Sequence, residues 1–182
     1  MCGGQGTRLG GASEKPLVPV GGTPMIDRVC AALAASRVDT VYAAVSPRAL
    51  ETRAHMTASA VTVVETPGDG YVADLTAALD RIGRPVLTVA ADLPLLAPAV
   101  VNRVLDRSDG SLAVAVPADL KRRLGVSVDT TFERGGERET ELAPTGINVV
   151  ASTDDDRYIS DDPRLAVNVN RPRDLWIAEA LS

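Results

Sequence analysis

The sequence predicts an α/β fold built on a doubly wound, mostly parallel, Rossmann-like sheet. Short apolar runs typical of buried strands alternate with longer segments whose apolar residues recur at helical spacing. This alternation indicates successive strand–helix–strand units, which form parallel sheets with helices on both faces. The chain has 182 residues, enough for one substantial core and too few for two ordinary ones. We therefore expect a single domain over residues 1–182.

The first half supplies the clearest elements. A helix is predicted over residues 24–36, where one apolar stripe repeats at the spacing i, i+3, i+4, i+7. An apolar strand follows at 40–45, then a weaker helix at 47–56 and a strand at 61–64. Residues 71–82 carry a second clear apolar stripe and predict a helix.

The second half begins with residues 85–90, a continuous apolar run typical of a strand buried on both faces. A helix is expected at 98–106, where proline suits the first turn, and a strand at 112–116. Residues 121–142 have weak periodicity and a charged, glycine-containing centre, which predicts a hairpin or a surface insertion. A strand at 147–151 and a closing helix at 172–181 complete the chain.

Composition excludes several classes of protein. No apolar run approaches the ~18 residues of a membrane span, and no secretory signal opens the chain. Two cysteines, Cys2 and Cys30, and one histidine, His55, give neither a disulfide framework nor a zinc site. The net charge of −5 argues against bulk binding to nucleic acid. We expect a cytoplasmic protein without a membrane span or a nucleic-acid partner.

A glycine-rich segment near the N-terminus is the strongest chemical signal. It runs Gly3, Gly4, Gln5, Gly6, Thr7, Arg8 and is followed by Glu14-Lys15-Pro16. Closely spaced glycines let backbone N–H groups approach a polyphosphate, and Arg8 and Lys15 add positive charge. The spacing matches neither a P-loop nor a dinucleotide fingerprint. The alternative is a flexible tail, which the Thr-Arg and Glu-Lys-Pro sequences disfavour.

Asp92 is the second candidate. It follows the buried strand at 85–90, and ligands of open α/β sheets gather at the carboxyl ends of strands. A carboxylate there suits Mg²⁺, which takes oxygen ligands and bridges substrate phosphates. The alternative is a capping residue for the proline-rich turn that follows.

The segment from Gly3 to Gly10 with its Glu-Lys-Pro sequel resembles the signature of the Rossmann-like nucleotidyltransferases. Residues 66–75, 144–150 and 168–175 are similar to the archaeal GTP:adenosylcobinamide-phosphate guanylyltransferases. The resemblance implies transfer of GMP from GTP to adenosylcobinamide phosphate in cobalamin biosynthesis, with Mg²⁺ on Asp92. It also implies a phosphorylated corrinoid as the acceptor partner.

Further residues are expected near the nucleotide. Asn170 matches a position that related enzymes use as a second metal ligand, although it could instead cap the last helix. Exposed backbone groups of the turn formed by Thr66, Gly68, Asp69 and Gly70 could read the guanine edge, or simply form a type II turn. Gly146 and Asn148 could contact the ribose or the acceptor, or be ordinary loop and strand residues.

Two other functions remain open from the sequence. A molybdenum-cofactor or sugar-phosphate nucleotidyltransferase would share the loop and Asp92 but differ in its acceptor pocket. A catalytically silent GTP-binding protein would keep the fold, although retention of Arg8, Lys15 and Asp92 disfavours it.

One feature departs from the resemblance. In that family an apolar strand precedes the glycine loop and lies centrally in the sheet. Met1 falls where that strand should be ending. We therefore expect the first strand to be truncated, by a start placed several codons late or by removal of residues.

Overall fold

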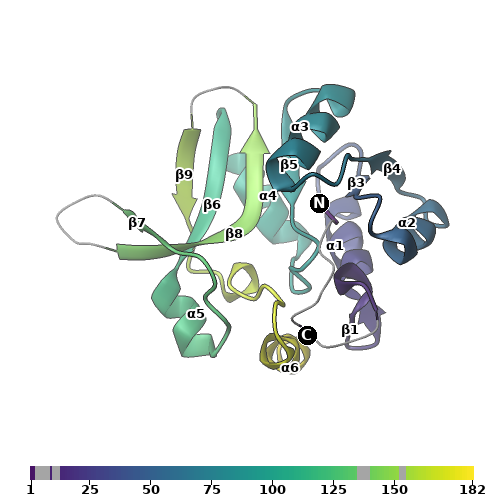
Figure 1. Ribbon diagram of the computed structural model, residues 1–182. Helices are drawn as coiled ribbons and strands as arrows, with labels where there is room; N and C mark the ends of the chain where they lie inside the picture. The colour runs from purple at the N-terminus through teal and green to yellow at the C-terminus, as the bar shows by residue number, and fades with distance from the viewer. Residues whose placement is uncertain (3–8, 10–12, 135–139, 152–154) are drawn as a thin grey trace.

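The α/β class predicted from the sequence is confirmed by the computed structural model, which describes residues 1–2, 9, 13–134, 140–151 and 155–182 (Figure 1). Its elements are, in chain order, η1 (Lys15–Leu17), β1 (Pro19–Val20), β2 (Thr23–Pro24), α1 (Met25–Ala34), β3 (Tyr42–Val45), α2 (Leu50–Thr57), β4 (Thr62–Glu65), α3 (Tyr71–Ile82), β5 (Val86–Val89), α4 (Pro98–Asp106), β6 (Ser111–Pro117), α5 (Ala118–Leu124), β7 (Phe132–Arg134), β8 (Thr140–Val150), β9 (Asp155–Ile159), η2 (Pro163–Leu165) and α6 (Pro172–Ala180).

The main strands form a parallel pair and a larger mixed sheet. Strands β3 and β4 pair in parallel, with Ala43 opposite Val63. The larger sheet has the order β5-β8-β6-β9, and β7 pairs with β8 at its edge. Strand β8 runs antiparallel to β5, β6 and β7, whereas β6 and β9 are parallel. The sheet is therefore mixed.

The first two residues join the pair to the larger sheet. The amino group of Met1 donates to Val89 O at 2.9 Å, and Cys2 N–H donates to Ala44 O at 2.9 Å. Residues 1–2 thus lie between β3 and β5, where Figure 1 marks the N-terminus. A cavity of about 440 Å³ lies beside Met1, lined by side chains of β3, β5 and α3.

Helices cover both faces of this region, as in a doubly wound fold. Successive side chains of a strand point to opposite faces of the sheet. Accordingly, Ala43 and Val45 pack in one apolar cluster with Met56 of α2, whereas Ala44 packs with Ala78 of α3. Helices α1 and α4 pack together in the largest cluster, against β6 and β8.

Residues 118–159 differ most from the sequence expectations. The hairpin expected within 121–142 exists as β7 and β8, but α5 takes its first residues. Strand β8 begins at Thr140 rather than at 147, and β9 was not predicted. Both strands depend on pairing with partners distant in sequence. In addition, the aspartates at 154–156 give the start of β9 a polar sequence that does not predict a strand.

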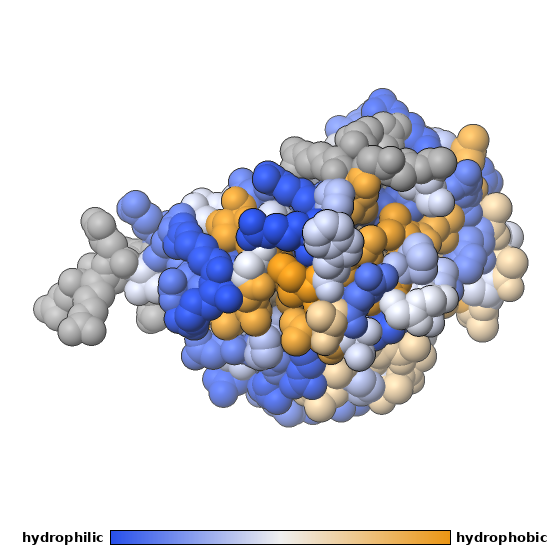
Figure 2. Space-filling view, turned by 90° about the horizontal axis from the view of Figure 1, so that it is seen from below, coloured by the Kyte–Doolittle hydropathy of each residue, from blue (hydrophilic) through white to orange (hydrophobic). Residues whose placement is uncertain are grey.

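The face seen from below in Figure 2 carries apolar side chains across its middle with polar ones around them. Helices α5 and α6 lie at this lower side of the molecule (Figure 1). Trp176 of α6 is 70% exposed.

None of the helices in the described part of the chain has the length and apolar character needed to span a bilayer.

Candidate active site

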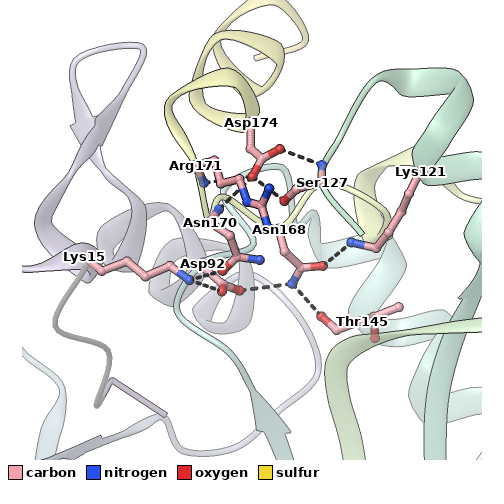
Figure 3. A network of polar contacts seen from close by, with 9 residues as sticks. All are labelled: Lys15, Asp92, Lys121, Ser127, Thr145, Asn168, Asn170, Arg171 and Asp174. Carbon is pink, nitrogen blue, oxygen red and sulfur yellow. Dashed lines mark hydrogen bonds and ion pairs between the residues drawn. The ribbon is translucent and has the colours of Figure 1, made fainter. Parts of the chain in front are cut away.

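Three segments bring polar side chains together just beyond the carboxyl end of β5 (Figure 3). Asp92 follows β5, Lys15 begins η1, and residues 168–170 lie between η2 and α6. The backbone fixes this arrangement, because Val169 N–H donates to Asp92 O at 3.0 Å. The site therefore lies where ligands of open α/β sheets are usually bound.

Lys15 is the centre of the site. Its Nζ donates to Asp92 Oδ2 and to Asn170 Oδ1, each at 2.6 Å. The side chains of Lys15 and Asp92 are only 16% and 17% exposed, so this ion pair is partly shielded from water. One ammonium group thus joins the two oxygens that the sequence analysis assigned to a metal ion.

Neither oxygen caps a helix. Helix α4 begins after Ala97, and the Asp92 carboxylate instead contacts Lys15 and Asn168. At α6 the carboxylate of Asp174 accepts from Arg171 N–H at 2.9 Å. The capping role considered for Asp92 and Asn170 is therefore not the one their side chains have here.

Asn168 holds the other oxygen of Asp92. Its Nδ2 donates to Asp92 Oδ1 at 3.1 Å and to Thr145 O of β8 at 2.9 Å. Its Oδ1 accepts from Lys121 Nζ at 2.8 Å. Burial lowers the pKa of Lys121, and the negative charges of Asp92, Asp174 and Asp129 oppose that shift.

Asp174 holds the backbone of the segment that carries Asn168 and Asn170. Its fully buried carboxylate accepts from the N–H groups of Asn170 and Arg171, at 3.0 and 2.9 Å. It also accepts from the N–H and hydroxyl groups of Ser127, both at 2.7 Å. Four donors compensate for the burial of the charge. These hydrogen bonds hold the backbone of Asn170 in the position from which its side chain accepts from Lys15.

Glu14 anchors the other side of Lys15. Its carboxylate accepts from Glu51 N–H at 3.1 Å and Thr52 N–H at 2.8 Å, in the first turn of α2. The residue before α2 is Ala49, which cannot cap a helix with its side chain. Burial raises the pKa of Glu14, but hydrogen bonds from Thr52 and Glu51 outweigh it and leave the pKa below its ordinary value.

The donor set suits a hard divalent cation. Asp92 Oδ2 and Asn170 Oδ1 each lie 2.6 Å from Lys15 Nζ, so they converge on the position that this ammonium group occupies here. In the described residues no group of three or more His, Cys, Asp or Glu side chains could hold a metal. Mg²⁺ needs no such cage, since it is commonly held by one or two protein oxygens, water and substrate phosphates.

The glycine loop itself lies outside the described residues. This applies to Gly3, Gly4, Gly6, Thr7 and Arg8, so their roles stay predictions. Cys2 precedes the loop beside Ala44, and Lys15 follows it beside Asp92. Both flanking residues therefore lie at the carboxyl edge of the sheet.

The turn predicted to read the base is held by internal hydrogen bonds. The N–H and hydroxyl groups of Thr66 both donate to Val45 O, at 3.0 and 3.3 Å. Gly68 N–H donates to Asp74 Oδ1 at 2.6 Å. Gly68 and Gly70 have φ angles of 80° and 111°, and Asp69 is exposed. Asp69 and the remaining backbone groups of the turn are the candidates left for contact with a base.

Gly146 and Asn148 lie in β8 rather than in the polar cluster. Gly146 has φ of 83°, and a Cβ there would lie 2.7 Å from Ala90 Cβ, so glycine permits the close approach of β8 to β5. Asn148 pairs with Thr88 inside the sheet. Neither residue contacts Lys15 or Asp92 through a hydrogen bond among the described residues.

Sequence reasoning missed Lys121, Asn168 and Asp174 as site residues. Lys15 and Lys121 are the two lysines of a chain with 19 basic residues, and both lie in this network. The scarcity of lysine in a chain rich in arginine could have identified Lys121 as a candidate site residue. Asp174 stands at the third position of α6, where an acidic residue commonly accepts from the N-cap N–H.

Comparisons with known proteins show which proteins this chain resembles. Residues 1–134 match the family model described as a MobA-like NTP transferase domain. The chain is 30% identical over 197 residues to the adenosylcobinamide-phosphate guanylyltransferase of Methanocaldococcus jannaschii, covering 100% of this chain and 94% of that protein.

Solved structures share the fold. A putative glucose-1-phosphate thymidylyltransferase from Bacillus anthracis superposes with a TM-score of 0.70 at 14% identity, covering 99% of this chain and 92% of that one. A hypothetical transferase from Thermus thermophilus gives a TM-score of 0.67 at 18% identity, with 91% of each chain covered. These likenesses show that the chain shares a Rossmann-like α/β fold with these proteins.

Proposed function

Since this chain belongs to the MobA-like NTP transferase family, we propose that it transfers GMP from GTP to adenosylcobinamide phosphate. The products are adenosylcobinamide-GDP and pyrophosphate. The likeness to the Methanocaldococcus enzyme over nearly all of both chains supports the archaeal type of this activity. The observation that carries the proposal is the convergence of Lys15, Asp92 Oδ2 and Asn170 Oδ1 at the carboxyl end of β5.

The reaction needs positioning and charge neutralisation more than a strong base. A phosphate monoester is largely ionised near neutral pH, so its oxygen attacks the α-phosphorus of GTP without prior removal of a proton. The bond from the α-phosphorus to the bridging oxygen breaks, and pyrophosphate leaves with its negative charge. Lys15 and Arg8 bind the triphosphate and stabilise the charge that develops.

Nucleotidyltransferases of this kind generally use a divalent metal ion, and we assign Mg²⁺ to Asp92 and Asn170, in the place that the Lys15 ammonium group takes here. Lys15 would then turn to the phosphates. When bound, Mg²⁺ would neutralise charge on the phosphate oxygens. Two hydrogen bonds support this assignment, because each holds one of the proposed ligands. Asn168 Nδ2 donates to Asp92, and the backbone N–H of Asn170 donates to Asp174.

The whole chain is proposed to act as one catalytic domain in the cytoplasm. Residues from position 15 to position 174 contribute to one hydrogen-bonded site.

Cys2 and Cys30 are free thiols. Burial raises the pKa of Cys30 to about 11, which keeps this thiol protonated and unreactive at neutral pH.

Release of pyrophosphate tests the proposal. The purified chain is incubated with GTP, Mg²⁺ and one acceptor at a time: adenosylcobinamide phosphate, molybdopterin, or a sugar 1-phosphate. We expect release with the corrinoid alone. Release with molybdopterin or a sugar phosphate instead would assign the chain to another branch. GTP binding without release under all conditions would indicate a silent binding protein.

A further inference from the structure

The buried amine of Lys121 has no part in the proposed chemistry, although it lies in the same network. Lys121 is on α5 and is only 4% exposed, so it cannot reach a substrate without a change of structure. The two residues after it on α5 instead form surface ion pairs, Arg122 with Glu141 and Arg123 with Asp119. Burying an amine is costly, so its retention calls for a role that surface arginines do not have.

Lys121 is one of three partners that fix which way the Asn168 amide faces. Its Nζ donates to Asn168 Oδ1 at 2.8 Å, and an ammonium group can only donate. On the other side, Asn168 Nδ2 meets two acceptors, Asp92 Oδ1 at 3.1 Å and Thr145 O at 2.9 Å. A flipped amide would place its NH₂ against the ammonium and its oxygen against a carboxylate and a carbonyl. The three partners together permit one orientation.

This orientation controls the Asp92 carboxylate. Asn168 holds Oδ1, and the carboxylate is thereby turned so that Oδ2 faces Lys15 and the position shared with Asn170 Oδ1. Figure 3 shows the chain of contacts from Lys121 through Asn168 to Asp92. Mutation of the partners that orient a metal ligand typically lowers metal affinity by about 10- to 100-fold.

We propose that Lys121 is a positioning residue: by locking the Asn168 amide it holds the Asp92 carboxylate in the orientation that binds a divalent cation. This inference rests on the metal site of the proposed function and adds a residue to its support. Lys121 touches neither the cation nor the nucleotide. It acts through Asn168, and its effect should vanish when Asn168 cannot transmit it.

Metal affinity is the direct test, because it requires no turnover. Mn²⁺ is titrated into the full chain with a non-hydrolysable GTP analogue, and free Mn²⁺ is followed by electron paramagnetic resonance. Lys121→Met, which keeps the apolar stem, should raise the Kd for Mn²⁺ by about 10- to 100-fold. Lys121→Arg keeps a donor and should recover part of that loss. Arg122→Met, on the exposed side of the same helix, is the matched control and should leave the Kd unchanged.

A double-mutant cycle separates positioning from a general structural role. In an Asn168→Ala background, Lys121→Met should cause no further rise in the Kd for Mn²⁺. A Lys121→Met variant that melts earlier but binds Mn²⁺ like Arg122→Met would overturn the proposal. So would equal effects of Lys121→Met in the wild-type and Asn168→Ala backgrounds.

A measurement on the unchanged protein covers the case in which Lys121→Met does not fold. The side-chain amide protons of Asn168, assigned by their loss in Asn168→Asp, should exchange with solvent far more slowly than those of the half-buried residue Asn102, whose hydrogen bond from Arg37 N–H is exposed to solvent. Exchange as fast as that of Asn102 would contradict the locked amide. Failure of GTP turnover with an intact Lys121 effect on Mn²⁺ would count against guanylyl transfer alone.

Discussion

At the scale of single residues, the site depends on one lysine that joins two loops. Lys15 donates hydrogen bonds to Asp92, which follows β5, and to Asn170, which precedes α6. It therefore links the two loops that form the site. In the proposed reaction the same ammonium group neutralises phosphate charge. Its contribution is therefore expected to be greater in the transition state than in the resting protein.

Replacing Lys15 should reduce turnover with little effect on folding. Lys15→Met removes the ammonium group and should lower kcat by roughly 10²- to 10³-fold or more, as for other groups that stabilise developing charge. Arg8→Ala is expected to act in the same direction. Arg37→Met, which breaks a surface pair with Asp106, is the control and should keep normal turnover. Near-normal turnover in both Lys15→Met and Arg8→Ala would show that the loop does not bind the triphosphate.

Glu14 gives a pH-dependent contribution to stability. Its folded-state pKa lies below its ordinary value, so the stabilising charge is fully present above the unfolded pKa of about 4.3. The contribution is lost as pH falls below that value and through the folded pKa. At pH 7, Glu14→Gln should cost about 0.3–1 kcal/mol, because the amide keeps an acceptor for the helix N-terminus but lacks the negative charge that is favourable there.

Urea unfolding at pH 7 and at pH 3 measures this difference. The gap between wild type and Glu14→Gln should be present at pH 7 and largely closed at pH 3. Glu51→Gln, which changes a carboxylate in the same turn without removing the cap, serves as the comparison. A gap that stays constant over this range would rule out the charged cap.

Single residues also show how far the sequence could predict the site. Asp92 was identified because a polar residue directly after a buried apolar run stands out locally. Lys121 could not be placed, because its partner Asn168 is 47 residues away and only the fold brings them together. The same limit applies to Ser127 and Asp174.

At the scale of elements, local pattern predicted helices better than strands. The expected ranges 71–82 and 98–106 match α3 and α4 because each carries its own apolar stripe and a proline or glycine boundary. Strand β8 gains its extra residues from pairing with β6 and β7, which no local pattern reveals. Strand β9 likewise depends on parallel pairing with β6.

The close approach of β8 to β5 should make Gly146 intolerant of a side chain. Gly146→Ala combines a positive φ with a contact of 2.7 Å to Ala90 Cβ. We expect a loss of about 1–2 kcal/mol from backbone strain and about 1–3 kcal/mol more from overpacking. Gly22→Ala has a similar φ of 81° but no atom within 4 Å, so it should show the strain alone. Equal losses of unfolding free energy in the two variants would contradict the packing explanation.

At the scale of the whole molecule, Met1 and Cys2 connect the two parts of the sheet through hydrogen bonds to Val89 O and Ala44 O. The cavity of about 440 Å³ beside Met1 exposes apolar side chains of β5 and α3. An extended apolar segment ahead of Met1 would continue the same backbone pairing. The amide N–H that replaces the amino group would keep the bond to Val89 O.

Filling this cavity should stabilise the fold. Adding about five apolar residues ahead of Met1 buries side chains that each contribute ~1.5–3 kcal/mol, against ~1–2 kcal/mol per residue for ordering the backbone. A net gain of about 2 kcal/mol would raise Tm by roughly 4–8 °C. An extension of equal length made of glycine and serine is the control. Equal melting temperatures for the two extensions would show that the cavity does not accept a strand.

The proposed activity of the whole molecule rests on the choice of nucleotide. Guanine offers hydrogen-bond donors at N1 and N2, whereas adenine has an acceptor at N1 and nothing at position 2. A site built for guanine would leave its own groups unpaired against adenine, at about 1–3 kcal/mol for each lost partner. Two such mismatches correspond to roughly a hundredfold preference, at 1.4 kcal/mol per factor of ten.

A competition experiment measures this preference in the reaction itself. The chain is given adenosylcobinamide phosphate, Mg²⁺ and equal concentrations of GTP, ATP, CTP and UTP, and the corrinoid products are separated by mass. We predict that the GMP adduct exceeds every other adduct by about a hundredfold or more. Equal amounts of the GMP and AMP adducts, or a dominant adduct of another nucleotide, would contradict guanylyl transfer.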